Sequence, residues 1–186
     1  MAIILASASP RRKELLGFIT EDFTVKVSDA EEITDPALSA EETVKSLAVI
    51  KGDAVAQLYP RDTVISADTV VVLDGKILGK PHSREEAYDM LSSLSGRGHT
   101  VYTGVCITSP GKRICFAEAT EVFFASLSDE DINTYISSGE PFDKAGGYGI
   151  QGKGSLMIKS INGDYYNVMG LPVARLYEAL RENSLI

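Results

Sequence analysis

A chain of 186 residues with 44% hydrophobic and 24% charged residues has the composition of a globular protein with a core of its own. Its formal net charge of −8 argues against binding to long nucleic acids, which usually needs a basic surface, and makes local basic clusters more informative. No apolar run approaches the roughly 20 residues of a membrane helix. The short apolar run at residues 2–6 lacks the basic leader of a signal peptide, so we expect a cytoplasmic protein without a membrane partner.

The first predicted elements are a strand, a helix and a second strand. Residues 3–6 are apolar and predict a strand. Ser9 followed by proline is typical of a helix start, and a glycine can end that helix, which we expect over residues 10–17. Residues 23–27 predict a further short strand.

A long helix, a buried strand and a hairpin are predicted next. Ser39 and Glu42 have the spacing of a capping box and begin a helix that we expect to reach about Leu58. Residues 63–73 are β-branched and mostly apolar, which predicts a buried strand. An Asp-Gly dipeptide then turns the chain into a short strand over residues 76–78.

The second half continues the alternation of helices and strands. The predicted elements are a helix capped by Ser83 that reaches Leu94, strands over 100–108 and 113–125, a helix from Ser128 to Gly139, a strand near 155–161 and a final helix starting at Pro172. This order predicts an α/β protein with a mixed sheet.

The segment SASPRRK places three cations in the first turn of the first helix, where the helix dipole favours acidic residues. Free backbone N–H groups at a junction of strand, loop and helix bind phosphate well. Ser7 and Ser9 add hydroxyl groups, and Arg11 and Arg12 add fork-shaped, permanently charged donors. A bound polyanion would explain these cations; the alternative is that the arginines project into solvent. The loop is not a Walker A motif, because GxxxxGK[ST] does not occur.

Asp68 interrupts an otherwise apolar strand, in the segment SADTVVV. Burying an ionised carboxylate without a partner is costly, so such a residue usually binds a metal, acts as a general base or pairs with a buried cation. The structural alternative is an ion pair with a nearby lysine, or a position at the end of the strand.

Further charged residues lie at the ends of predicted elements. Glu31 and Glu32 lie in a loop, Lys51 lies in the long helix, and Lys80 follows a short strand. Carboxylates such as those of Glu32 and Asp68 suit Mg²⁺ or Mn²⁺, with a nucleotide phosphate completing the coordination shell. Taken singly, each of these residues is more often a solvated charge.

The segment EPFDKAGGYGIQG is rich in glycine, which permits close approach of the backbone to a ligand. Gln151 carries both a donor and an acceptor, which suits recognition of a base edge. The alternative is a pair of glycine-rich turns between sheet elements. His82 is expected at the surface and His99 at the start of a strand, and no HExxH motif occurs.

Taken together, several segments resemble the Maf proteins, which are nucleoside triphosphate pyrophosphatases also described as inhibitors of septum formation. The matching segments are SASPRRKELL, SADTVVV, GKP, the SG-x-x-H-x-V-x-T-G pattern over 95–104, EPFDKAGGYGIQG and NGDYYNVMGLP. They follow the order of the family between residues 5 and 172.

The resemblance implies an α/β fold of two lobes around an elongated mixed sheet with a central cleft, related in shape to the inosine triphosphate pyrophosphatases. It implies that residues 1–186 form a single domain of this kind. It also implies hydrolysis of a nucleoside triphosphate to the monophosphate and pyrophosphate with Mg²⁺ or Mn²⁺, and a homodimer is consistent with the habit of the family.

Carried over residue by residue, the resemblance makes Asp68 the catalytic residue and places Glu32 and Asp68 at the metal. Three positions set specificity in the family, and their residues here, Arg11, Thr69 and Gln151, resemble the branch that acts on dTTP and UTP; a sister branch prefers 7-methyl-GTP. The implied substrate-binding residues are Ser7, Ser9, Arg11, Arg12, Lys51, Thr69, Lys80 and Gln151.

Two other classes of function stay open at this point. One is a non-enzymatic nucleotide-binding regulator of septum formation, and the other is a phosphotransferase. Asp68 favours the enzyme, because a protein that only binds a polyanion gains little from a carboxylate unless a metal intervenes. The absence of Walker A and kinase motifs counts against a phosphotransferase. Modified pyrimidine nucleotides are alternative substrates to dTTP and UTP.

Overall fold

The computed structural model describes all residues from Met1 to Ile186. Seven strands form one mixed sheet in the order β2-β1-β3-β5-β6-β7, with β4 paired to β3. The strands are β1 (Ile3–Leu5), β2 (Phe23–Val25), β3 (Thr63–Leu73), β4 (Lys76–Leu78), β5 (Gly98–Ser109), β6 (Lys112–Phe124) and β7 (Ile158–Asn162). The predicted α/β fold with a mixed sheet is confirmed.

Six α-helices and three short 3₁₀ helices accompany the sheet. The α-helices are α1 (Pro10–Gly17), α2 (Ala40–Leu58), α3 (Arg84–Leu94), α4 (Asp129–Ser137), α5 (Tyr165–Met169) and α6 (Val173–Glu182). The 3₁₀ helices are η1 (Glu140–Asp143), η2 (Ala145–Gly147) and η3 (Gly152–Met157). None of the helices combines the length and the apolar character that crossing a membrane requires.

The chain divides into two compact units. The first unit comprises residues 1–69, 103–118 and 170–186, and the second comprises residues 70–102 and 119–169. The long strands β3, β5 and β6 each contribute residues to both units.

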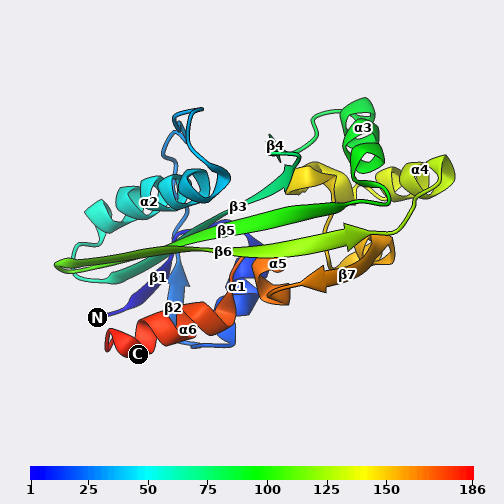
Figure 1. Cartoon of the computed structure of the whole chain (residues 1–186). Coiled ribbons are helices and arrows are strands. Elements are labelled where there is room, and N and C mark those ends of the chain that lie inside the picture. Colours follow the sequence, from blue (N-terminus) through cyan, green and yellow to red (C-terminus); the bar gives the residue numbers. More distant parts are fainter. The chain divides into compact units, whose positions relative to one another are not determined.

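In the first unit, β1 lies between two parallel neighbours. Ile3 is in register with Phe23 of β2 and with Thr63 of β3. Helix α2 lies on one face of these strands, and α1 and α6 lie on the other (Figure 1). Burial of apolar side chains from β1, α2 and β3 ties these elements together, as Ile4, Val55 and Val64 illustrate.

Helix α2 is held against β3 and β5 by close contacts that exclude larger side chains. A Cβ atom on Gly104 of β5 would lie 2.4 Å from the carbonyl oxygen of Val44, and one on Gly52 would lie 2.6 Å from Oγ of Ser66. Ser66 Oγ also donates to the backbone oxygen of Ala48 at 2.6 Å. Lys51 precedes Gly52 in α2, so these contacts also fix the position of Lys51 relative to the strands.

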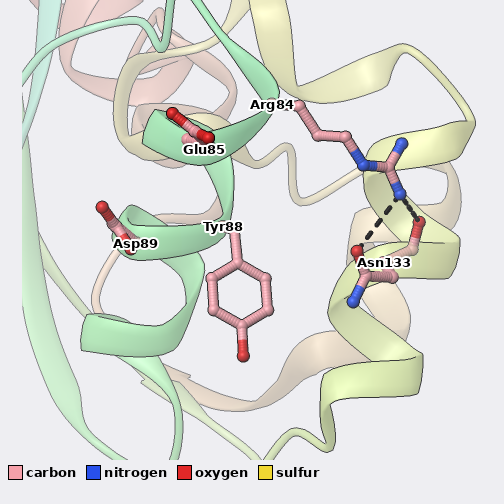
Figure 2. Close-up of a pocket in the computed structure, with 5 residues that line it drawn as sticks. All are labelled: Arg84, Glu85, Tyr88, Asp89 and Asn133. Atoms are coloured by element: carbon pink, nitrogen blue, oxygen red, sulfur yellow. Dashed lines mark hydrogen bonds between the residues drawn. The ribbon is translucent and has the colours of Figure 1, made fainter.

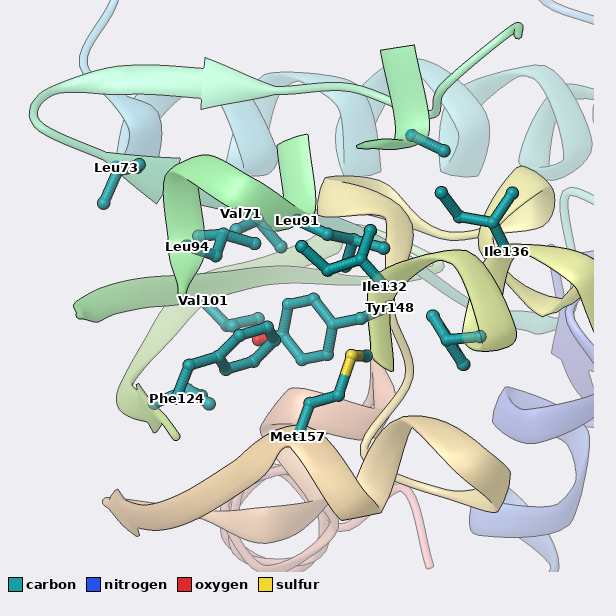
Figure 3. Packing of buried hydrophobic residues seen from close by; sticks show 13 residues of the cluster. Val71, Leu73, Leu91, Leu94, Val101, Phe124, Ile132, Ile136, Tyr148 and Met157 are labelled. Atoms are coloured by element: carbon teal, nitrogen blue, oxygen red, sulfur yellow. The ribbon is translucent and has the colours of Figure 1, made fainter. Parts of the chain in front are cut away.

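In the second unit, the predicted Asp-Gly turn joins β3 to β4, and Val71 pairs with Leu78. Both turn residues have positive φ, 51° at Asp74 and 75° at Gly75, which matches a type I′ hairpin turn. The core of this unit gathers apolar side chains from its strands, from α3 and α4 and from the glycine-rich stretch, as Leu91 and Tyr148 illustrate (Figure 3).

The structure differs from the prediction mainly around glycines and at strand ends. Strand β2 ends at Val25 instead of residue 27. The strand expected near 155–161 begins only at Ile158, because η3 occupies the residues before it. The short helices η1 to η3 and α5 were not predicted, since elements of so few residues leave no apolar periodicity in a sequence.

Candidate functional site

The loop between β1 and α1 is organised by its own serines. Ser9 is the N-cap of α1, with extended backbone angles, and its Oγ accepts from the backbone N–H of Arg12 at 3.4 Å. Ser7 is buried, and its Oγ accepts from the backbone N–H of Ser9 at 3.2 Å. The predicted helix start is confirmed, and the first turn contains no acidic residue.

The Arg12 guanidinium donates hydrogen bonds to three groups, two of them in distant parts of the sequence and one in the loop before α1. Nε donates to the backbone oxygen of Gly170 at 2.8 Å, Nη2 to Thr69 Oγ1 at 2.9 Å, and Nη1 to Ser7 Oγ at 3.4 Å. Burial lowers the pKa of Arg12, while the negative charge of Asp68 opposes that shift. The alternative in which Arg12 projects into solvent is therefore wrong. Three of the five N–H donors of the guanidinium are used, and two are left for a ligand.

Lys51 joins the predicted carboxylates into one cluster. Its Nζ donates to Asp68 Oδ1 at 2.5 Å and lies 3.0 Å from Glu32 Oε2. The side chains of Lys51 and Asp68 are largely buried, at 16% and 13% exposure, whereas Glu32 reaches in from the loop with 49% exposure. The ion pair that the sequence left open as the structural alternative for Asp68 is present.

The basic and acidic residues of the first unit act on one another. The charges of Asp68, Arg11 and Glu32 all influence the pKa of Arg12, and Lys51 contacts both carboxylates. Three cations and two carboxylates therefore lie around the start of α1, the middle of α2 and the middle of β3. This arrangement can hold an anion beside a carboxylate, as the chemistry of a metal-bound polyphosphate requires.

The carboxylate oxygens of the cluster also suit a divalent cation. Carboxylate oxygens of Glu32 and Asp68 converge on a single cationic atom, Lys51 Nζ. No group of three or more His, Cys, Asp or Glu residues suited to a metal is present. Mg²⁺ is commonly held by one or two carboxylates together with substrate phosphates, so two converging carboxylates match that mode of binding.

Lys80 and Gln151 belong to the second unit, in two segments that contact each other. Gly146 donates its backbone N–H to the oxygen of Gly79 at 2.9 Å, next to Lys80. Lys80 is exposed after β4, and Gln151 is half-buried immediately before η3. The positive φ of 69° at Gly146, with Val71 side-chain atoms 3.0 Å from the place of a Cβ, explains the glycine there.

A separate hollow of the second unit lies between α3 and α4 and contains none of the predicted site residues (Figure 2). Arg84 crosses this hollow from α3, and its Nη2 donates to Asn133 Oδ1 of α4 at 3.1 Å. The hollow is lined by Arg84, Glu85, Tyr88, Asp89 and Asn133.

Comparison with known proteins identifies the family. The family described as Maf-like protein matches residues 2–183. This chain belongs to the Maf-like proteins. A relative from Bacillus cereus, described as dTTP/UTP pyrophosphatase, is 51% identical over 180 residues, covering 97% of this chain and 94% of that protein. A relative of the same description from Bacillus velezensis is 52% identical, covering 97% of this chain and 95% of that protein.

A solved structure, that of the Staphylococcus aureus Ham1 protein, shares the fold of this Maf-like protein. The TM-score is 0.50 at 19% sequence identity, over 66% of this chain and 71% of the Ham1 chain. At this identity the likeness concerns the arrangement of helices and strands only.

Two residues that contact Arg12 or Thr69 were not among the predicted site residues. Gly170 supplies the backbone oxygen for Arg12, and Thr103 Oγ1 lies 2.9 Å from Thr69 Oγ1. Both lie in segments that resemble the family, but nothing in a sequence links residue 12 with residue 170.

Proposed function

We propose that this Maf-like protein hydrolyses dTTP and UTP to the nucleoside monophosphates and pyrophosphate, as a single domain over residues 1–186. One observation carries the proposal: Asp68, Glu32 and Lys51 form one contact cluster beside the half-buried Arg12 and the start of α1. Identity of about half of all residues to proteins described as dTTP/UTP pyrophosphatases supports the substrate class.

In this proposal Asp68 and Glu32 hold the divalent cation, Mg²⁺ or Mn²⁺. When bound, the cation supplies positive charge that screens the triphosphate and the departing pyrophosphate. The convergence of the two carboxylates on Lys51 Nζ supports their joint role.

The triphosphate is bound by the start of α1 together with basic side chains. Ser7 and Ser9 shape the loop by accepting from the backbone N–H groups of Ser9 and Arg12. The start of α1 carries the positive end of the helix dipole, which favours an anion there. Arg11, the two remaining donors of Arg12 and Lys51 add positive charge, which offsets the charge that develops on the leaving group. This assignment explains the cations in the first turn, whose charge opposes the helix dipole unless an anion is present.

Asp68 orients the attacking water and accepts its proton. Its Oδ1 accepts from Lys51, so Oδ2 is the oxygen proposed to face both the cation and the water. The water oxygen forms a bond to the α-phosphorus, the bond from that phosphorus to the oxygen bridging to the β-phosphorus breaks, and the electron pair leaves with pyrophosphate. Catalysis of this kind rests on positioning and electrostatic stabilisation.

Lys80 and Gln151 complete the proposed substrate-binding residues. Lys80 adds a cation for the phosphates, and Gln151 offers both a donor and an acceptor to a base edge. Arg11, Thr69 and Gln151 set the preference for dTTP and UTP in this proposal. The segments of the second unit that carry Lys80 and Gln151 are joined by the hydrogen bond between Gly146 and Gly79, which supports a common role for these two residues.

The test is analysis of the reaction products in the presence of Mg²⁺ or Mn²⁺. The substrates are UTP, dTTP, CTP, GTP, 5-methyl derivatives of the pyrimidine triphosphates and pseudouridine triphosphate. We expect UTP and dTTP to yield monophosphate and pyrophosphate in equal amounts. Binding of these nucleotides without turnover would support the regulator of septum formation instead. Turnover that requires an acceptor molecule would support a phosphotransferase.

A further inference from the structure

The hydroxyl of Thr69 is shared between a cation and a second hydroxyl. Thr69 Oγ1 accepts from Arg12 Nη2 at 2.9 Å and lies 2.9 Å from Thr103 Oγ1. Thr103 lies on β5 and is fully buried, whereas Thr69 on β3 is only partly buried and follows Asp68 directly. Thr103 therefore contacts the site residue Thr69 from within the protein interior.

The contact with Thr103 restricts what Thr69 can offer to a ligand. A threonine hydroxyl has one proton and two lone pairs, and Arg12 occupies one lone pair. If Thr69 donates to Thr103, it retains one lone pair and acts only as an acceptor. If Thr103 donates to Thr69, both lone pairs of Thr69 are filled and it acts only as a donor. In either case Thr69 meets a ligand in a single role.

We propose that Thr103 is a specificity-determining positioning residue, which fixes the proton of Thr69 so that Thr69 distinguishes a carbonyl from an amino group on the pyrimidine ring. The proposal rests on the proposed function. Uracil and thymine carry a carbonyl oxygen at position 4 and an N–H at position 3, whereas cytosine carries an amino group and a bare nitrogen there. At positions 3 and 4, the hydrogen-bond donor of one kind of ring is therefore replaced by an acceptor in the other, and the acceptor by a donor. A hydroxyl whose proton is fixed can form a hydrogen bond at a given position with only one of the two kinds of ring.

A freely rotating hydroxyl would lose this discrimination. Without the Thr103 hydroxyl, Thr69 would still accept from Arg12, but its proton and its second lone pair would both be available. It could then donate to one ring or accept from the other, so the values of kcat/KM for UTP and CTP would become more similar.

The experiment compares kcat/KM for UTP and CTP in the wild-type protein, Thr103→Val, Thr103→Ser and Thr63→Val. Thr103→Val keeps the side-chain shape and removes the hydroxyl, and Thr103→Ser keeps the hydroxyl. Thr63 is the matched control, because it is also buried on a strand of the first unit and its hydroxyl has no hydrogen-bond partner. Thermal unfolding of each variant separates loss of stability from loss of discrimination.

We expect Thr103→Val to reduce the ratio of kcat/KM for UTP to that for CTP about tenfold, which corresponds to about 1.4 kcal/mol. Thr103→Ser and Thr63→Val should keep the wild-type ratio. An unchanged ratio in Thr103→Val would overturn the proposal, even if overall activity falls, and so would a wild-type protein that treats UTP and CTP alike. Failure of the wild-type protein to hydrolyse UTP at all would overturn the proposed function instead.

Discussion

Lys51 Nζ of α2 donates to Asp68 Oδ1 of β3 at 2.5 Å, and both side chains are largely buried. The pair depends on the docking of α2, because Gly52 next to Lys51 packs directly on Ser66, two residues before Asp68. The strand therefore presents its one carboxylate to the one lysine on the buried face of the helix. Nearby Glu32 gives the same lysine a second acceptor.

Substitution of Lys51 tests this ion pair. Lys51→Met leaves Asp68 as a largely buried carboxylate without its cation, so the free energy of unfolding should fall by roughly 1–3 kcal/mol. The kcat for UTP should fall at least about tenfold, because the charge beside the leaving group is lost. Lys45→Met is the control, since Lys45 lies on the same helix and pairs only with Glu41 of the neighbouring turn. Wild-type kcat in Lys51→Met would contradict a role for the pair in turnover.

Glu32 and Glu31 offer a matched pair for the proposed cation. Glu32 shares Lys51 with Asp68, whereas Glu31 is its exposed neighbour in the same loop. Glu32→Gln should raise the Mg²⁺ concentration that gives half-maximal activity about tenfold or more, because one charged oxygen ligand is weakened. Glu31→Gln should leave the Mg²⁺ titration unchanged. Equal effects of the two substitutions would remove Glu32 from the proposed metal ligands.

Gly170 is expected to tolerate no side chain. Its φ is 110°, and a Cβ would lie 3.3 Å from Thr69 Oγ1 and 3.5 Å from Arg12 Nε. Gly170→Ala should therefore cost roughly 1–3 kcal/mol of stability and lower kcat/KM, since it displaces the arginine. Gly111→Ala controls for the backbone alone, because Gly111 also has positive φ, 75°, but open space around it. Equal losses of kcat/KM in both variants would contradict a role of Gly170 in positioning Arg12.

His99 makes the stability of the second unit sensitive to acid. Burial lowers the pKa of His99 to about 4, and Nδ1 of its ring has no hydrogen-bond partner. Its Nε2 lies 2.5 Å from the hydroxyl of Tyr148, and burial raises the pKa of that phenol, which stays neutral. A protonated ring would thus be a buried cation without a charged partner.

The unfolded chain takes up a proton at His99 at higher pH than the folded chain does. Stability from this residue is therefore present above about pH 6.5, the unperturbed value, and is lost as the pH falls towards about 4. The loss is on the order of 3 kcal/mol. His99→Gln should flatten this part of the stability curve measured by urea unfolding, whereas His82→Gln at the exposed second histidine should not. A wild-type slope in His99→Gln would show that other groups cause the loss.

Local chemistry made much of the fold predictable. Ser9, Ser39, Ser83 and Ser128 each accept a backbone N–H in the first turn of a helix, as their sequence contexts indicate. The strand over 63–73 and the hairpin after it have the predicted bounds, because their signals lie within a few residues. Such short-range rules are independent of the rest of the chain.

The pairings within the site are long-range and were not predictable in the same way. Arg12 and Gly170 are 158 positions apart, and Thr69 and Thr103 are 34 positions apart. A sequence identifies Asp68 as unusual because a carboxylate in an apolar strand is costly, but it does not say which cation compensates it. The packing of α2 on β3 and β5 decides that question in favour of Lys51.

The most direct test of the central claim is pyrophosphate release from UTP and dTTP by the wild-type protein and by Asp68→Asn, with Asp53→Asn as the matched control. Asp53 also pairs with a cation in the first unit, Arg113, but belongs to the surface of α2. We predict that Asp68→Asn folds normally and loses about 100-fold or more in kcat, as expected for removal of a general base, while Asp53→Asn stays near the wild type. If Asp68→Asn retained more than about a tenth of the wild-type kcat, a change below about 1.4 kcal/mol, Asp68 would not be the catalytic base.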